Sequence, residues 1–211
     1  METGLNDRRA KLRHAMRFVV IGLFATTAAG QEMGADHAAH MAVAGHVAAA
    51  AQDDHGIRVD FELIDRNGRV VTDEDFRGQF VLLGFGFTHC AHICPLMALN
   101  IGQVVKGAGR EMAGIFVSVD TERDSAAITH EYAAHFGDSM LGLSGSIEQI
   151  NAAAKNFKVS YAVTKTQDAY TVQHTANVFL IDPDGELVDV FSFSASPESI
   201  LANIDAAPAR R

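Results

Sequence analysis

The chain contains only two cysteines, Cys90 and Cys94, and their spacing of four is its most informative feature. A strand-like apolar run, Phe80 to Leu83, precedes them, and a helix-like run follows. The N-terminus of a helix carries partial positive charge and unpaired N–H groups, which favour thiolate over thiol. Because thiolate is both the nucleophile and the metal-binding form of cysteine, the pair predicts a redox site or a site for a soft metal.

The helix start fixes how the two thiols relate to each other. If Cys94 lies in the first helical turn, the spacing of four puts both sulfurs on one face. Pro95 agrees with this position, because proline is tolerated at the first positions of a helix. A disulfide closing so small a ring would add little stability, so the pair is interpreted as chemical rather than structural.

The N-terminal segment predicts export. Residues 1–17 hold five basic and two acidic residues, and the uncharged stretch Phe18 to Gly30 follows. This stretch is shorter than the roughly 20 residues of a bilayer span, but it fits the apolar part of a secretory signal. We therefore interpret residues 1–30 as a signal peptide or membrane tether. The expected location is the bacterial periplasm, either soluble or tethered to the inner membrane.

Length and charge restrict the remaining chain. The 211 residues, 48% of them hydrophobic, predict one domain of ordinary size, placed at residues 57–207. The net charge of −9 argues against a nucleic-acid partner, which needs a basic face. Residues 31–56 are interpreted as a linker. Its histidines and methionines are either weak copper-capturing groups or residues of a spacer that tolerates any polar side chain: Met33, His37, His40, Met41, His46 and His55.

Hydrophobic periodicity predicts strands that alternate with helices. The expected strands are residues 57–64, 69–71, 80–87, 114–119, 141–143, 171–181 and 186–191. The expected helices are residues 96–105, 125–136, 146–157 and 196–206. Turns are expected at Asn67-Gly68 and at residues 182–185. This order predicts an α/β protein with a thioredoxin-like fold, in which an N-terminal β-hairpin precedes a central sheet covered by helices.

Four segments together resemble the Sco (SenC) family of thioredoxin-fold copper-delivery proteins of respiratory membranes. They are residues 85–95, 118–124, 143–150 and 174–185, and the similarity extends over residues 57–206. The resemblance implies that Cys90, Cys94 and His174 are copper ligands. It also implies delivery of copper to the dinuclear copper centre of cytochrome c oxidase, or to a similar copper enzyme. The implied partners are the copper-accepting subunit of a respiratory oxidase and thiol reductant proteins.

The chemistry of these side chains agrees with copper. Soft thiolates select Cu(I), whereas imidazole accommodates either valence. Three ligands leave a position open for the incoming ligand of an acceptor, while a structural zinc site would need a fourth fixed ligand. His174 is expected next to a loop over residues 164–173, which would let metal enter and leave.

The sequence departs from the family pattern beside these ligands. Ala91-His92 stands where the family commonly has Pro-Asp, so His92 is an extra ligand, a base for the thiols or a solvent-exposed residue. Gln173 replaces the aspartate that often precedes the ligand histidine, which puts a carboxylate partner for His174 in doubt. His89 matches the family pattern and is expected to point away from the metal.

A second function remains open, that of a thiol-disulfide oxidoreductase with a redox-active Cys90–Cys94 disulfide. Such a protein would keep the acceptor's cysteines reduced. Thioredoxin-like reductases, however, have two residues between their cysteines rather than three. They also have a cis-proline opposite the pair, and no proline lies between Pro95 and Pro183. A peroxiredoxin-like peroxidase is disfavoured because Thr88 lies two residues before Cys90 instead of three.

Overall fold

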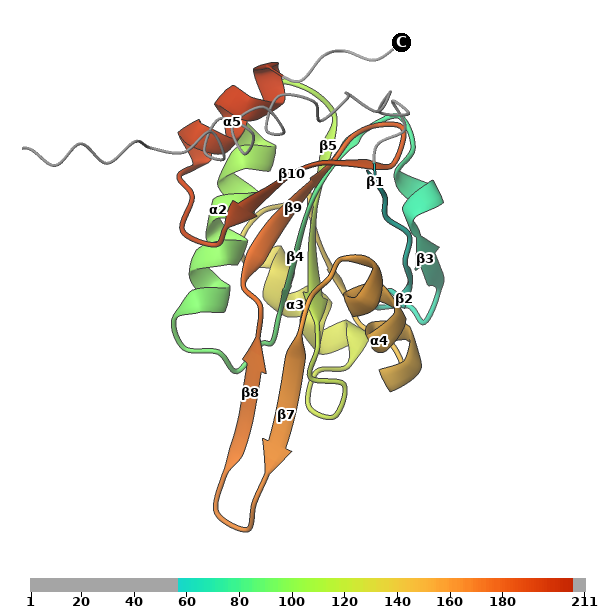
Figure 1. Ribbon diagram of the computed structural model, residues 1–211, viewed down its shortest axis with the longest axis vertical. Coiled ribbons are helices and arrows are strands. Elements are labelled where there is room, and N and C mark those ends of the chain that lie inside the picture. Colours follow the sequence, from blue (N-terminus) through green and yellow to red (C-terminus); the bar gives the residue numbers. More distant parts are fainter. Residues whose placement is uncertain (1–56, 207–211) are drawn as a thin grey trace, which may run out of the picture. The chain divides into compact units, whose positions relative to one another are not determined.

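The computed structural model describes residues 57–206, whose centre is a six-stranded sheet in the order β1-β10-β9-β4-β5-β6 (Figure 1). Its strands are β1 (Ile57–Arg58), β4 (Phe80–Gly86), β5 (Met112–Ser118), β6 (Met140–Leu143), β9 (Asn177–Ile181) and β10 (Glu186–Ser192). Strands β4, β5 and β6 are parallel, whereas β9 runs antiparallel to β4. The expected signal segment and linker lie outside the described residues.

Two small hairpins and a set of helices complete the domain. The hairpins are β2 (Glu62–Ile64) with β3 (Val70–Thr72), and β7 (Tyr161–Lys165) with β8 (Tyr170–His174). The helices are η1 (Asp73–Phe76), α2 (Ile93–Gly107), α3 (Ala126–Ala134), α4 (Ile147–Asn156) and α5 (Pro197–Ala206). No helix within residues 57–206 is long and apolar enough to cross a membrane.

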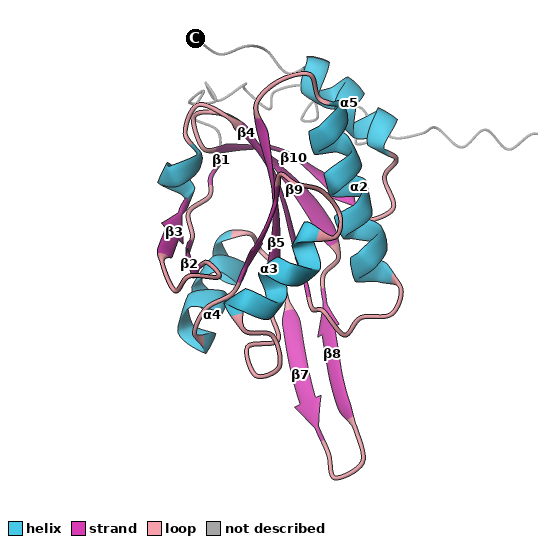
Figure 2. Cartoon of the chain, turned by 180° about the vertical axis from the view of Figure 1, so that it is seen from behind, coloured by secondary structure: helices cyan, strands magenta, loops and turns pink. Residues whose placement is uncertain are grey.

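Apolar side chains fill both faces of the sheet, and Figure 2 shows the helices lying against it. On one face, α2, α3 and α5 cover a core that includes Leu82, Met97 and Phe116. On the other face, α4 and the β2–β3 hairpin cover a core that includes Leu63, Phe85 and Phe157. Strands β4 and β5 are buried along their whole length, which explains why both read as continuous apolar runs.

The strand directions bring three segments to one edge of the sheet. Because β4 and β5 are parallel, the loops that follow Gly86 and Ser118 leave from the same edge. Strand β9 begins at that edge, since Val178 pairs with Gly84 near the end of β4. The β7–β8 hairpin leads directly into β9 and extends beyond this edge (Figure 1).

The structure confirms the thioredoxin-like α/β fold and corrects parts of its predicted outline. The N-terminal hairpin turns through Gly68, which has a positive φ of 77°. Helices α3 and α4 begin after the capping residues Ser125 and Ser146. The expected strand 57–64 is wrong, because two short strands replace it.

The segment around His174 was also predicted incorrectly. The expected loop 164–173 and strand 171–181 are instead the β7–β8 hairpin followed by the separate strand β9. His174 is therefore the last residue of a strand, and a hydrogen-bonded ladder holds the segment that was expected to be a loop.

Candidate metal site

Cys90 and Cys94 occupy the junction between β4 and α2. Cys90 is partly buried in the loop after β4, and Cys94 is the fully buried second residue of α2. The backbone N–H of Cys94 donates to Sγ of Cys90 over 3.4 Å. The first cysteine therefore caps the helix that carries the second, and both are free thiols.

The two thiols differ in acidity because their surroundings differ. Partial burial raises the pKa of Cys90, but the backbone N–H groups of Cys94, His92 and Ile93 outweigh it and hold that pKa below its ordinary value. Burial strongly raises the pKa of Cys94, and the neighbouring Cys90 raises it further. Cys90 is thus the more nucleophilic thiol, and Cys94 holds its proton.

His174 meets the thiol pair from a distant part of the chain. Its Nε2 lies 3.4 Å from Sγ of Cys94, a residue 80 positions earlier. Its Nδ1 lies 3.1 Å from the carbonyl oxygen of Thr175, and a proton donated there leaves Nε2 as an acceptor for the thiol. Burial lowers the pKa of His174, and the hydrogen bond to Thr175 offsets part of that effect. The neutral imidazole, the form that binds metals, is therefore favoured.

The contact between Cys94 and His174 has the dimensions of a shared metal site. A sulfur at about 2.3 Å and a nitrogen at about 2.05 Å from one ion, at a tetrahedral angle, lie roughly 3.6 Å apart. The observed separation of 3.4 Å fits this value. Within residues 57–206, no three His, Cys, Asp or Glu side chains are gathered closely enough to hold a metal ion.

His89 and His92 lie beside the cysteines in the sequence, but both side chains are exposed. His89 is exposed, and its Nδ1 lies 3.1 Å from Oγ1 of Thr88 rather than beside the thiols. His92 is the exposed N-cap residue of α2 and makes no capping hydrogen bond with its side chain. The carbonyl of Thr175 partners Nδ1 of His174, so no carboxylate at position 173 is needed for that role.

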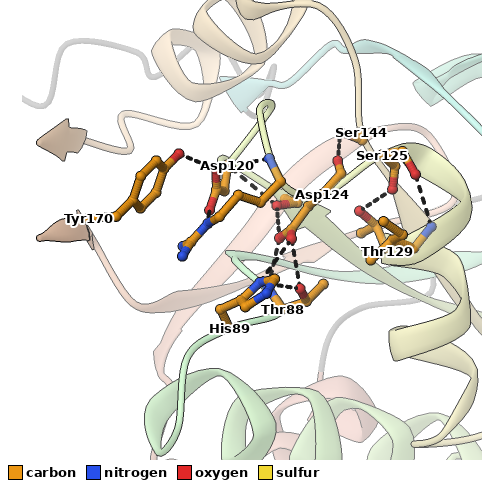
Figure 3. Close-up of polar contacts among 11 residues, drawn as sticks. Thr88, His89, Asp120, Asp124, Ser125, Thr129, Ser144 and Tyr170 are labelled. Atoms are coloured by element: carbon orange, nitrogen blue, oxygen red, sulfur yellow. Dashed lines mark hydrogen bonds and ion pairs between the residues drawn. The ribbon is translucent and has the colours of Figure 1, made fainter. Parts of the chain in front are cut away.

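A buried carboxylate holds the loop that carries Cys90 (Figure 3). Asp124 accepts hydrogen bonds from the backbone N–H and the hydroxyl of Thr88, both at 2.7 Å, and from the hydroxyl of Ser118 at 2.6 Å. Its own carbonyl accepts from the hydroxyl of Ser144. A fully buried carboxylate needs such donors, and here two of them belong to the residue two before Cys90.

A second buried carboxylate lies on the same loop and faces the hairpin. Asp120 accepts from the hydroxyl of Tyr170 at 2.6 Å and from Nε of Arg123 at 2.5 Å. Figure 3 shows Asp120 between Tyr170 and Asp124. Residues 120–124 thus contact both segments that carry the candidate ligands.

Sequence reasoning assigned no role to these supporting residues. Asp120 and Asp124 were part of the segment 118–124 that resembles the family, and this was the only signal for them. Tyr132 was missed as well. Its hydroxyl is the one buried side-chain polar atom within residues 57–206 without a hydrogen-bond partner. Burial raises its pKa, and the nearby Cys94 adds to that effect, so the hydroxyl keeps its proton.

Comparison with known proteins places the chain among its relatives. The family model described as SCO1/SenC matches residues 49–208. "Protein SCO2 homolog, mitochondrial" of Mus musculus is 40% identical over 152 residues, which are 69% of this chain and 60% of the mouse protein. The chain thus spans less than two thirds of that relative's length.

Two solved structures are informative. Bradyrhizobium japonicum ScoI with copper bound is 35% identical, has a TM-score of 0.64, and is matched over 72% of this chain and 99% of its own. BsSco, described as a member of the Sco family of cytochrome c oxidase assembly proteins, is 26% identical with a TM-score of 0.56. That match covers 72% of this chain and 94% of BsSco. The extent of the family match shows that this chain belongs to the SCO1/SenC family.

Proposed function

We propose that this protein carries copper, binds it through Cys90, Cys94 and His174, and delivers it to the dinuclear copper centre of cytochrome c oxidase or to a similar copper enzyme. The observation that carries the proposal is the 3.4 Å contact between Sγ of Cys94 and Nε2 of His174. Sγ of Cys90 is close to this pair, because it accepts a hydrogen bond from the backbone N–H of Cys94. The copper-bound relative from Bradyrhizobium japonicum and the assembly role stated for BsSco support the same conclusion.

The donor set suits a carrier that handles both copper valences. Two thiolates and one imidazole can hold Cu(I) in three-coordination, and Cu(II) can take a further ligand. Copper uptake must displace the proton of Cys94, whose pKa burial raises. Uptake therefore releases protons, and the affinity rises with pH.

Delivery begins at the accessible side of the site. Cys90 is partly exposed, whereas Cys94 is fully buried behind it. His174 is also partly exposed, so an acceptor thiolate should replace Cys90 or His174 before Cys94. The basic start and apolar stretch of residues 1–30 support export to the periplasm, with or without a tether to the inner membrane.

The ligand set is tested by metal titration of the reduced protein under anaerobic conditions. His174→Ala is expected to abolish stoichiometric Cu(II) binding and to weaken Cu(I) binding less, because thiolate is the softer ligand. His135→Ala is the control, since it removes an exposed imidazole at the end of α3 and should leave both affinities unchanged. Full Cu(II) affinity in His174→Ala would exclude His174 as a ligand.

A thiol-disulfide reductase is the second candidate, and one observation favours it. Cys90 is the accessible thiol with a lowered pKa, and Cys94 is a buried partner, an arrangement suited to attack by the first and resolution by the second. His174→Ala separates the two functions. It should keep exchange with a small disulfide, yet fail to restore oxidase assembly in cells that lack this protein. Full restoration at limiting copper would favour the reductase.

A further inference from the structure

Strand β8 ends at His174, and its first residue, Tyr170, attaches it to the rest of the domain. Side chains alternate along a strand, so Tyr170, Val172 and His174 share one face. These three are partly buried, whereas Thr171 and Gln173 are exposed, so this face lies against the domain.

Tyr170 has a buried and charged partner. Its hydroxyl donates to Oδ1 of Asp120 at 2.6 Å, and this carboxylate is fully buried. The guanidinium of Arg123 lies 3.9 Å from the centre of the tyrosine ring and donates to the second oxygen of Asp120. A charge-assisted hydrogen bond at the hydroxyl and a cation over the ring face together hold the Tyr170 side chain in one orientation.

The same arginine lies near the surroundings of His174. Its guanidinium is 6.0 Å from the centre of the Phe87 ring, and that ring meets the His174 ring edge-on with centres 5.8 Å apart. Tyr170 and His174 lie at the two ends of β8, and they contact Asp120 and Phe87 respectively. Arg123 lies near both of these partners. Since Asp124 holds Thr88, the loop 120–124 contacts the hairpin and the cysteine loop together (Figure 3).

We propose that Tyr170 is a positioning residue of the copper site, which sets the place of His174 relative to Cys94 through its attachment to Asp120 and Arg123. The inference rests on the proposed function, because it explains the attachment of Tyr170 as a way to hold a copper ligand in position. Another contact joins the same two segments, the ion pair between Lys165 and Glu122. Those side chains are 49% and 54% exposed, and exposed pairs contribute little.

The first test uses the copper-free, reduced protein. Tyr170→Phe keeps the ring beside Arg123 and removes only the hydroxyl, so the domain should fold. The ring signals of His174, assigned in NMR spectra by comparison with His174→Ala, should shift or broaden in Tyr170→Phe. Thr171→Val is the matched control, because Thr171 lies on the exposed face of the same strand, and it should leave those signals unchanged. Wild-type His174 signals in Tyr170→Phe would overturn the proposal.

The second test asks whether Tyr170 acts through His174. Cu(I) affinity is measured by competition with a Cu(I) chelator for the wild type, Tyr170→Phe, His174→Ala and the double variant. Tyr170→Phe should weaken binding about tenfold, the lower end of the effect expected when a group that orients a metal ligand is removed, and should add nothing when His174 is absent.

Two other results are distinguishable. Equal weakening in both backgrounds would mean a general loosening of the domain and would overturn the positioning role. Wild-type Cu(I) and Cu(II) affinities in His174→Ala would overturn the ligand set of the proposed function, and the NMR comparison would still decide whether Tyr170 positions His174.

Discussion

Thr88→Val tests whether the carboxylate of Asp124 holds the cysteine loop in place. Valine has nearly the shape of threonine, so the substitution leaves no cavity and removes one hydroxyl donor. The lost bond is short, 2.7 Å, and its acceptor is a carboxylate with no exposed surface. A hydrogen bond to a charged group contributes about 1.5–3 kcal/mol. Asp124 keeps the Thr88 backbone N–H and the Ser118 hydroxyl, so we expect a loss of about 2 kcal/mol.

Urea denaturation followed by circular dichroism measures this loss as a change in the free energy of unfolding. The melting temperature should fall by roughly 4–8 °C for a domain of this size. Thr171→Val is the control, since Thr171 is an exposed threonine on β8, where valine is equally well accommodated. A loss below about 0.5 kcal/mol in Thr88→Val would refute the reasoning, because surface substitutions alone produce changes of that size.

Two further predictions concern the thiols. Alkylation of the reduced protein should modify Cys90 before Cys94, with a pH midpoint below that of a free cysteine, because the pKa of Cys90 is lowered and that of Cys94 is raised. Mass spectrometry of partially alkylated protein checks the order, and equal labelling would contradict it. Protein with a Cys90–Cys94 disulfide should bind negligible copper until a dithiol reduces it, since oxidation removes both thiolates. Equal loading of oxidised and reduced samples, measured as bound copper, would place the site outside the thiol pair.

The thiol half of the site could be predicted from the sequence because its signals are local. A buried strand, two cysteines four apart and Pro95 lie within a few residues of one another. The structure places Cys94 in the first turn of α2, the position that Pro95 favoured. The cap between Cys90 and the N–H of Cys94 follows from the same short segment.

The hairpin half could not be predicted in the same way. Its turn contains Thr166 and Ala169, which are joined by a backbone hydrogen bond of 2.8 Å, and it lacks the Asn-Gly or Asp-Gly pair that marks a tight hairpin. The polar residues before Tyr170 therefore read as a loop. The bond from Tyr170 to Asp120 spans 50 residues, and no local pattern reports a contact of that separation.

The two halves of the site are also held by different kinds of contact. A Cβ added at Gly86 would lie 3.0 Å from Sγ of Cys94 and 2.7 Å from the ring of Phe116, so the thiol half is packed into the core without spare room. His174 is instead held in place by the two-stranded β7–β8 hairpin and by side-chain contacts such as the one with the Phe87 ring. Thr88→Val and Tyr170→Phe each remove one short hydroxyl bond to a fully buried carboxylate, so both should lower folding stability by similar amounts. Only Tyr170→Phe should also change the place of His174, and this difference is what makes the two substitutions informative together.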